Sequence, residues 1–332
     1  MKHMNAEIFS TLSIILLCWI LLLITDAAVC GLLKLIAGIR FRTTFVWGCL
    51  SLLIPPLAIA WGALVERNMF RVKKVEVVCS TLPEAFDGYR IIHISDIHAR
   101  SFEGREKRVE KAVERMNALE ADMVAFTGDL ITTSTDELDI IGGILGGLRA
   151  KDGVFSVLGN HDYSMYSDMG PEDREKAMEE LMNIQKEMGW NLLMNENRTI
   201  RHGKDSIAVV GVENTSPSRH FPSKGDLPKG SEGTEDMFRI LLSHDPLHWE
   251  AEVVGKDYPL TLSGHTHAMQ FSIFGWSPSR LMFPHYRGLY AKGTQYIYVN
   301  PGLGETIFPA RIGVRPEITL ITLKLGNPGK FL

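Results

Sequence analysis

The chain has 332 residues, a formal net charge of −4 at pH 7 and a hydrophobic content of 45%. This length allows one large domain or two smaller ones, and the composition excludes the disordered and fibrous classes. The four cysteines, at positions 18, 30, 49 and 79, exclude a dense disulfide scaffold and a zinc site built from two CxxC pairs.

Charge is distributed unevenly along the chain. Residues 1–74 carry a net charge of +5, whereas residues 75–332 carry −9. Tight binding to a nucleic-acid backbone depends on clustered Lys and Arg side chains, which an acidic domain of this kind does not supply. A nucleic acid is therefore not the expected ligand of residues 75–332.

The N-terminal part contains two apolar runs. Ile8–Thr25 provides 18 nearly continuous apolar residues, and Thr43–Val65 provides 23 uncharged residues, with tryptophans near both ends. A hydrocarbon core of roughly 30 Å requires about 20 such residues in a helix. We expect two transmembrane helices that form a hairpin, the second kinked at Pro55-Pro56, so residues 1–74 are predicted to be a membrane anchor.

A cleaved signal peptide is the alternative interpretation of the first run, and Ala28-Val29-Cys30 weakly resembles a lipoprotein cleavage site. The length of the first run and the presence of a second one favour two spans. The basic residues that flank the spans slightly favour both ends of the anchor inside, but the margin is too small to fix the side of the membrane that holds the larger domain.

Downstream of the anchor, strand and helix patterns alternate. They occur in the order 89–95 (strand), 105–120 (helix), 122–127 (strand), 136–148 (helix), 153–158 (strand) and 171–188 (helix). Further strands are expected at 207–212, 238–242, 259–262, 296–299 and 318–323. This order predicts a layered α/β sandwich with a mixed sheet. Ser216–Thr234 is rich in Ser, Gly and Pro and is expected to be an exposed loop, with a lid over the site as one interpretation.

Metal-type ligands follow most of these strands. Five blocks share this position: Asp96-x-His98, Gly128-Asp129, Gly159-Asn160-His161-Asp162, Ser243-His244-Asp245 and Gly264-His265-Thr266-His267. Side chains at the carboxyl ends of successive strands meet at one edge of an open α/β sheet. His, Asp and Asn without Cys suit Mn, Fe, Zn or Ni ions, whereas an all-oxygen site would not need histidines. Each block is a weak signal by itself, but together the five blocks predict a metal centre.

In this order the blocks resemble the calcineurin-like metallophosphoesterases. The resemblance covers residues 75–325. The sequence around the blocks, such as SDIH, VLGNHDY and SGHTH, is similar to the membrane-attached bacterial phosphodiesterase branch typified by YaeI and YkuE. It implies an α/β/β/α sandwich for a catalytic domain at residues 75–332, attached to a bacterial inner membrane. One departure is Ala268-Met269, where many relatives have two glycines. This change is expected to alter the floor of the pocket without removing a ligand.

The resemblance also implies seven ligands for two divalent metal ions, which would be Mn, Fe, Zn or Ni, with Mn favoured. One ion would be held by Asp96, His98 and His267, the other by Asn160, His244 and His265, and Asp129 would bridge both. A hydroxide between the ions would then attack phosphorus in line, while the ions cancel charge on the non-bridging oxygens.

His161 is the implied catalytic residue. The resemblance gives it contact with the phosphate and protonation of the leaving oxygen, a role that histidine side chains commonly have in enzymes. Asp162 is expected either to orient His161 or to serve as a turn residue. His93 is expected in the core by its place in the first strand of the domain.

Other polar residues leave alternatives open. His285 and Arg287 could line the substrate pocket or anchor a loop, and Asn300 could support the ligand loops. The histidines outside every block are expected at the surface, and these are His3, His202, His220 and His248.

Together these features predict a membrane-anchored phosphoesterase with a dinuclear metal centre. Arg100 is the only arginine immediately beside a ligand block, and a diester, which keeps one negative charge, suits a site with few cations. A phosphodiesterase is therefore the main prediction, acting on an envelope or nucleotide-linked lipid such as UDP-diacylglucosamine. The alternatives are a phosphomonoesterase or protein phosphatase, a nuclease, and a non-catalytic metal-binding membrane module.

Overall fold

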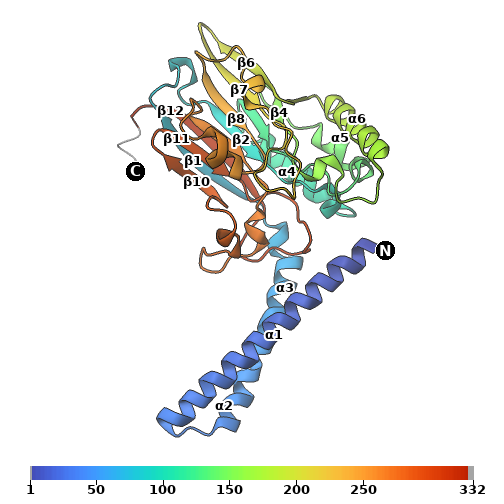
Figure 1. The fold of residues 1–332 in the computed structure, drawn as a ribbon, viewed down its shortest axis with the longest axis vertical. Coiled ribbons are helices and arrows are strands. Elements are labelled where there is room, and N and C mark those ends of the chain that lie inside the picture. The colour runs from blue at the N-terminus through green and yellow to red at the C-terminus, as the bar shows by residue number, and fades with distance from the viewer. Residues whose placement is uncertain (1, 328–332) are drawn as a thin grey trace.

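The computed structural model describes residues 2–327, and it shows an apolar helical hairpin beneath a larger α/β domain (Figure 1). The hairpin consists of α1 (Lys2–Ala37), α2 (Phe41–Gly48) and α3 (Ile54–Leu64), with a 3-10 stretch, Cys49–Leu53, between α2 and α3. Thr11–Ala37 and Phe41–Asn68 are both long and apolar enough to cross a membrane. The second stretch is irregular just before Pro55-Pro56, because proline cannot continue a helix by donating a backbone hydrogen bond.

Two hydrogen bonds join the arms of the hairpin. The indole nitrogen of Trp19 donates to the carbonyl of Leu52 at 2.7 Å, and the hydroxyl of Ser51 donates to Asp26 Oδ2 at 2.8 Å. The second bond gives the Asp26 carboxylate a partner inside the apolar region. Accordingly, the first helix continues past Asp26 to Ala37, beyond the apolar run that ends at Thr25.

The α/β domain contains two sheets of six strands. The first sheet has the strand order β1 (Arg71–Cys79), β12 (Glu317–Leu325), β2 (Arg90–Ile94), β3 (Met123–Phe126), β4 (Val154–Ser156) and β5 (Trp190–Leu192). The second sheet has the order β10 (Gly288–Lys292), β11 (Gln295–Val299), β9 (Leu260–Ser263), β8 (Phe238–Leu242), β7 (Asp205–Gly211) and β6 (Glu196–His202). Strands β2 to β5 are parallel, as are β11, β9, β8 and β7, whereas β12, β10 and β6 run antiparallel to β2, β11 and β7.

Three apolar layers hold the sheets and helices together. Ile91 and Met123 of the first sheet pack with Leu260 and Tyr298 of the second, which forms the central layer. The outer face of the first sheet is covered by α4 (Glu106–Asn117), α5 (Ile141–Leu145) and α6 (Pro171–Glu187). The outer face of the second sheet packs against α7 (Leu227–Gly230) and Trp249. The predicted α/β/β/α sandwich is thus confirmed.

Some predicted elements differ from the structure. The helix expected over 136–148 is a 3-10 turn, Thr135–Leu138, followed by the short α5, because the glycines at 142, 143, 146 and 147 favour helix poorly. Strands β1, β5, β6 and β10 were not predicted, and each lies at an edge of its sheet. Strand β1 crosses the boundary that composition predicts at residue 74.

The hairpin joins the domain through a buried ionic cluster. Arg67 is 4% exposed and its guanidinium contacts Glu305 Oε2 at 2.6 Å, while Arg108 contacts the other oxygen of the same carboxylate at 3.1 Å. Arg67 also donates to the carbonyl of Pro309 at 2.9 Å. The end of the hairpin is therefore packed into the domain.

Candidate dinuclear metal centre

The five sequence blocks meet at one end of the sandwich, where parallel strands of both sheets end. They follow β2, β3 and β4 in the first sheet and β8 and β9 in the second, at the carboxyl ends of parallel strands. Five of the seven predicted ligands adopt positive φ angles, which turn the chain sharply at the strand ends: Asp96, His98, Asp129, His265 and His267. Positive φ is uncommon outside glycine, and such strained residues cluster at functional sites.

Glycines next to the ligands allow this close approach. A Cβ atom at Gly128, where φ is +92°, would lie 2.4 Å from the backbone nitrogen of Gly159. A Cβ atom at Gly264 would lie 2.3 Å from Asp96 Oδ2. Both glycines are thus required for the ends of neighbouring strands to come together.

The first cluster contains Asp96, His98 and His267. His267 Nε2 lies 3.2 Å from Asp96 Oδ1 and 3.0 Å from His98 Nε2. All three side chains are buried. Burial holds the pKa of His98 well below its ordinary value, so this imidazole is neutral, which is the form that binds metals.

The second cluster contains Asn160, His244 and His265. Asn160 Oδ1 lies 2.8 Å from His265 Nδ1 and 3.2 Å from His244 Nε2, and those two ring nitrogens lie 3.2 Å apart. The amide of Asn160 is oriented by Tyr166, whose hydroxyl accepts from Asn160 Nδ2 at 2.9 Å. The oxygen of Asn160 therefore faces the two histidines.

Asp129 lies between the two clusters. Its Oδ2 is 3.6 Å from His98 Nε2 and 3.2 Å from His244 Nε2, whereas its Oδ1 accepts the backbone N–H of His161 at 2.9 Å. A single carboxylate oxygen, rather than two, thus faces both clusters. Burial opposes ionisation of Asp129, yet His244 and other histidines nearby hold its pKa well below the ordinary value.

The donor set fits cations. His244 Nδ1 donates to the carbonyl of Thr127 at 2.7 Å, which leaves the lone pair of Nε2 directed at Asp129 Oδ2, Asn160 Oδ1 and His265 Nδ1. The other converging atoms are acceptors, and His265 Nδ1 carries at most one proton, so the cluster calls for a cation or an added proton. Burial lowers the proton affinity of His244, but Asp129 outweighs it and raises the pKa of His244 to about 10. A metal ion would replace this proton.

His161 lies beside His98 of the first cluster and beside Asp129. Its Nδ1 is 2.8 Å from the carbonyl of Thr132, so this nitrogen donates and Nε2 is left available. A ring nitrogen of His161 lies within 4.8 Å of ligand atoms of His98 and Asp129. The side chain is half-buried, unlike the fully buried His98.

Asp162 does not orient His161, which corrects one of the two roles expected for it. Its carboxylate instead accepts four backbone N–H groups from the two ligand loops: Asp129 and Gly159 on Oδ2, and Leu130 and Ile131 on Oδ1. The side chain points mainly toward the preceding ligand loop, and the carbonyl of Thr132 takes its place beside the ring of His161. Asp162 thus holds the ligand loops together.

Two residues near the centre were missed from the sequence. Tyr166 lies six residues after Asn160 and packs its ring 4.3 Å from that of His161. Arg311 is fully buried and its Nη2 lies 3.4 Å from His267 Nδ1, although the two residues are 44 positions apart in the chain. Burial lowers the pKa of Arg311 to about 10. Tyr166 could have been found by its closeness to a ligand block, but no local signal identifies Arg311.

The other histidines follow the predictions only in part. His93 is buried and hydrogen-bonded to Thr127, as predicted for a core residue. His248 is also buried, at 1% exposure, and Ser243 satisfies its Nδ1 at 2.8 Å, so its predicted surface position is wrong. His202 is half-buried and stacks on Phe86, whereas His220 is exposed. The side chain of His3 lies outside the residues that the structure describes.

The residues with open alternatives act mainly as anchors. His285 packs edge-on against Trp249, and Arg287 donates to the carbonyl of Gly313. Asn300 donates to the carbonyl of His93 and accepts the N–H of Gly302, which supports the loop after β11.

Two loops border the centre. In the segment 216–234, Phe221 places its ring edge-on to His265, with 4.8 Å between the ring centroids, so this loop reaches over the second cluster. After His267, Ala268 and Met269 both have positive φ angles, of 47° and 50°. This conformation explains why glycine is favourable at these two positions, where the chain departs from the resembled family.

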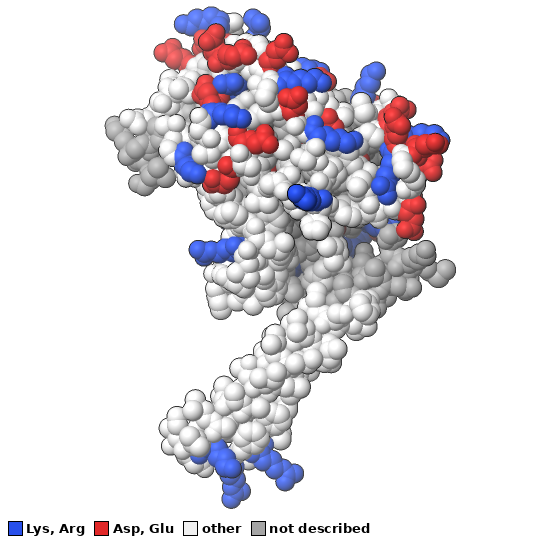
Figure 2. All heavy atoms as spheres, in the orientation of Figure 1, with Lys and Arg blue, Asp and Glu red and all other residues white. Residues whose placement is uncertain are grey.

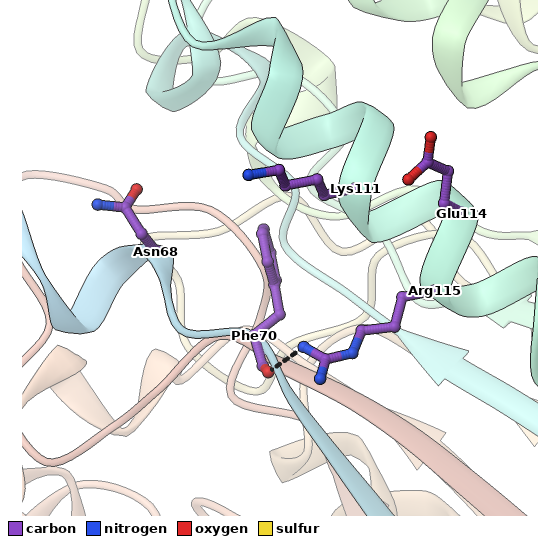
Figure 3. A pocket seen from close by; sticks show the side chains of 5 residues that line it. All are labelled: Asn68, Phe70, Lys111, Glu114 and Arg115. Carbon is purple, nitrogen blue, oxygen red and sulfur yellow. Dashed lines mark hydrogen bonds between the residues drawn. The ribbon is translucent and has the colours of Figure 1, made fainter.

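A separate hollow of about 400 Å³ lies where the hairpin meets α4 (Figure 3). It is lined by Asn68, Phe70, Lys111, Glu114 and Arg115, and Arg115 donates to the carbonyl of Phe70 at 2.8 Å. None of these residues belongs to the five ligand blocks. The hollow therefore contributes no chemistry to the metal centre.

Comparison with known proteins agrees with this geometry. The chain is 32% identical over 281 residues to the transmembrane protein with metallophosphoesterase domain of Bos taurus, covering 83% of this chain but only 62% of that protein. It is 29% identical to the metallophosphoesterase YkuE of Bacillus subtilis, covering 80% and 90% of the two chains. It is also 26% identical to the UDP-2,3-diacylglucosamine pyrophosphatase LpxG of Chlamydia trachomatis, covering 75% and 88%.

A family model describes the central part of the domain. The calcineurin-like phosphoesterase model matches residues 89–269, which is more than half of the chain and includes all five ligand blocks. The chain therefore belongs to the calcineurin-like phosphoesterase family.

Proposed function

We propose that the chain is a membrane-anchored phosphodiesterase that uses two divalent metal ions. The observation that carries this proposal is the convergence of seven metal-type ligands from five strand ends of two sheets. Residues 1–74 would be the anchor and residues 75–332 the catalytic domain. Strand β1 crosses the boundary between them. The two apolar stretches of the hairpin and the name of the bovine relative support an integral membrane protein.

The ligand assignment follows the two clusters. Asp96, His98 and His267 would hold one ion, and Asn160, His244 and His265 the other. Asp129 would bridge them through Oδ2, because this oxygen faces both clusters. The bound ions would supply Lewis-acid stabilisation of charge on phosphoryl oxygens and lower the pKa of the attacking water. Mn²⁺ suits this mixture of imidazole, carboxylate and amide ligands.

The protein side chains then position the proton donor. The carbonyl of Thr132 fixes His161 Nδ1 as a donor, so His161 Nε2 is the atom that would give a proton to the leaving oxygen. Its half-buried position gives a substrate access to the ring. Asp162 keeps the loops of Asp129 and Gly159 in register through four backbone hydrogen bonds.

Preference for a diester is supported by the state of the nearby arginines. Arg311 spends its donors on the carbonyls of Pro301 and Gly304, and Arg100 lies 3.8 Å from Glu137. Arg311 is thus committed to backbone carbonyls and the charge of Arg100 is compensated by Glu137, so neither adds an unpaired positive charge for the dianion of a monoester. A site whose nearest arginines are engaged in this way favours a substrate with a single negative charge.

A lipid-linked substrate is supported by the anchor and by one relative. LpxG is named as a pyrophosphatase of UDP-2,3-diacylglucosamine, and this chain covers 88% of it. An anchored domain meets lipid headgroups at high local concentration. We therefore propose an envelope or nucleotide-linked lipid as the substrate class.

The full chain in lipid nanodiscs, loaded with Mn²⁺, tests the proposal. We expect turnover of a nitrophenyl phosphodiester to exceed that of the corresponding monoester. His161→Ala should keep the metal content and reduce turnover by roughly 10²–10⁴-fold, because it removes a general acid. His202→Ala, at a half-buried position that stacks on Phe86 away from the ligand blocks, is the matched control. Monoester preference would refute the diesterase proposal, and equal turnover in the His161 variant would refute the acid role.

A further inference from the structure

An apolar loop follows the last metal-ligand block. Between Ala268 and Tyr286 the only Lys, Arg, Asp or Glu is Arg280. We define the apolar loop as residues 271–282. Its exposed large side chains are Ile273, Phe274, Trp276, Leu281 and Met282. Phe274 is fully exposed and Leu281 is 81% exposed, so packing within the domain does not account for these residues.

The tip of the apolar loop is a strained turn with an aromatic residue. Ile273 and Trp276 exchange two backbone hydrogen bonds of 2.9 and 3.0 Å, which closes a two-residue turn over Phe274 and Gly275. Both central residues have positive φ angles, 51° and 85°. Turns of this kind favour Asn-Gly, and a bulky residue at positive φ is an outlier. Neither the backbone conformation of the turn nor packing in the core therefore explains a phenylalanine at position 274.

The apolar loop is tied to the end of the hairpin through one intervening segment. Ser272 donates its N–H to the carbonyl of Ile312 at 2.8 Å, and the next residue, Gly313, donates to Glu66 Oε2 at 3.0 Å. Glu66 comes two residues after α3 ends. The loop thus lies on the hairpin side of the domain, where the orange segments surround the upper end of α3 (Figure 1).

The uncharged surface of the hairpin continues onto the adjoining part of the domain. In Figure 2 the charged side chains gather over the part of the domain away from the hairpin and at the far tip of the hairpin. Between them lies a nearly uncharged belt that includes the hairpin and the lower part of the domain. A surface that separates water-exposed charge from an apolar span in this way matches the profile of a bilayer.

We propose that the apolar loop inserts into the membrane interface beside the hairpin. It would be a third contact with lipid, in addition to the two apolar stretches of the hairpin. Phe274 and Leu281 would reach the acyl boundary, Trp276 would lie at headgroup level, and Arg280 would face anionic lipid phosphates. The occupant of this surface is therefore the lipid bilayer, because the loop continues the apolar surface of the hairpin and carries no acidic side chain.

The proposal rests on the membrane anchor proposed above and adds a consequence for the site. The chain passes from His267 to the apolar loop through Ala268, Met269 and Gln270, all at positive φ. Such a constrained connection leaves little freedom between the ligand and the inserted tip. The loop would therefore hold the metal centre at a fixed height above the lipid headgroups.

Site-specific fluorescence on the full chain in lipid vesicles tests the insertion. The four natural cysteines are replaced by alanine, and a nitrobenzoxadiazole label is attached to a single new cysteine in Phe274→Cys, Leu57→Cys or Ile140→Cys. Leu57 is an exposed residue of α3 and reports on the hairpin, whereas Ile140 is 64% exposed and is the control on the catalytic domain outside the loop. Vesicles of phosphatidylethanolamine and phosphatidylglycerol with and without doxyl-labelled lipid provide the quencher.

We expect the label at 274 to shift to shorter wavelength and to be quenched by shallow doxyl lipid, as at 57, with no change at 140. Quenching at 57 but not at 274 would overturn the inference and leave the anchor standing. A wavelength shift at 274 without quenching would also overturn it, since a protein surface would then cover the loop. No quenching at 57 would reject the anchor itself, and the inference with it.

A second measurement avoids the cysteine replacements. In the otherwise natural chain, brominated lipid quenches tryptophans near the bilayer, and Trp276→Phe should remove part of this quenching. Trp190→Phe is the matched control, because Trp190 is buried in the core of the domain. Equal quenching in the wild-type chain and the Trp276 variant would overturn the insertion.

Discussion

Removal of the Asp162 carboxylate should destabilise the domain strongly. Its two oxygens each accept two backbone N–H groups, with three distances of 2.8 Å and one of 3.2 Å, and the side chain is 1% exposed. Each buried donor that loses its partner costs about 1 kcal/mol or more. Asp162→Ala leaves four such donors, which gives a loss of about 4 kcal/mol.

Asp162→Asn separates the hydrogen bonds from the packing of the side chain. The amide keeps one oxygen and hence two of the four bonds, so about half of the loss is expected, roughly 2 kcal/mol. For a domain of this size, 1 kcal/mol corresponds to about 2–4 °C in melting temperature. The Ala variant should therefore melt about 10 °C below the wild-type chain, with the Asn variant between them.

The assay is thermal unfolding of the full chain in nanodiscs, with metal content measured on the same samples. The control is Asp257→Asn, whose carboxylate is exposed where it pairs with Arg239 at 3.3 Å and is therefore well screened by water. Because Asp162 positions the loops of Asp129 and Gly159, both Asp162 variants should also bind metal about 10–100-fold more weakly. A melting temperature for Asp162→Ala that matches the Asp257 control would refute this account of the ligand loops.

Three further predictions follow from the same structure. Gly128→Ala should abolish metal retention while leaving the hairpin inserted, because its Cβ atom would overlap Gly159 N at 2.4 Å; normal metal content by elemental analysis would contradict the close approach. Arg67→Met should lower the stability of the domain by about 2–3 kcal/mol and expose the junction to protease, since Glu305 keeps Arg108 as its only ionic partner among the described residues. Chelation of metal should lower the melting temperature, and Mn²⁺ at 100 times its Kd should restore about 2.7 kcal/mol; a melting temperature that does not respond to either treatment would argue against the centre.

The sequence indicated which side chains meet in the two clusters, because each block is a local signal. A strand pattern followed by His, Asp or Asn can be recognised within a few residues, and strands that run parallel bring their ends together. The order of the strands β2, β3 and β4 could be inferred in the same way. The long-range pairing of β1 with β12, which joins Arg71 to Glu317, has no local signal of this kind.

Residues that act across the chain could not be predicted. Arg311 reaches His267 from a loop 44 positions away, and Asp162 turns away from its neighbour His161 to bind backbone groups of the preceding ligand loop. The environment of His248 depends on Ser243 and the second sheet, although its sequence context resembles a surface turn. In each case the three-dimensional packing, rather than the residue pattern, determines the role of the side chain.

The buried contact between Arg67 and Glu305 has a consequence for how the enzyme would find its substrate. A domain on a flexible tether sweeps a large volume and samples many orientations. Here the span ends inside the domain itself, so with the hairpin in a bilayer the catalytic centre would face the membrane plane at one angle. The catalytic centre would then meet its substrate by lateral diffusion of the lipid. The height of the substrate's phosphate above the bilayer would determine whether it is hydrolysed as much as its chemistry does.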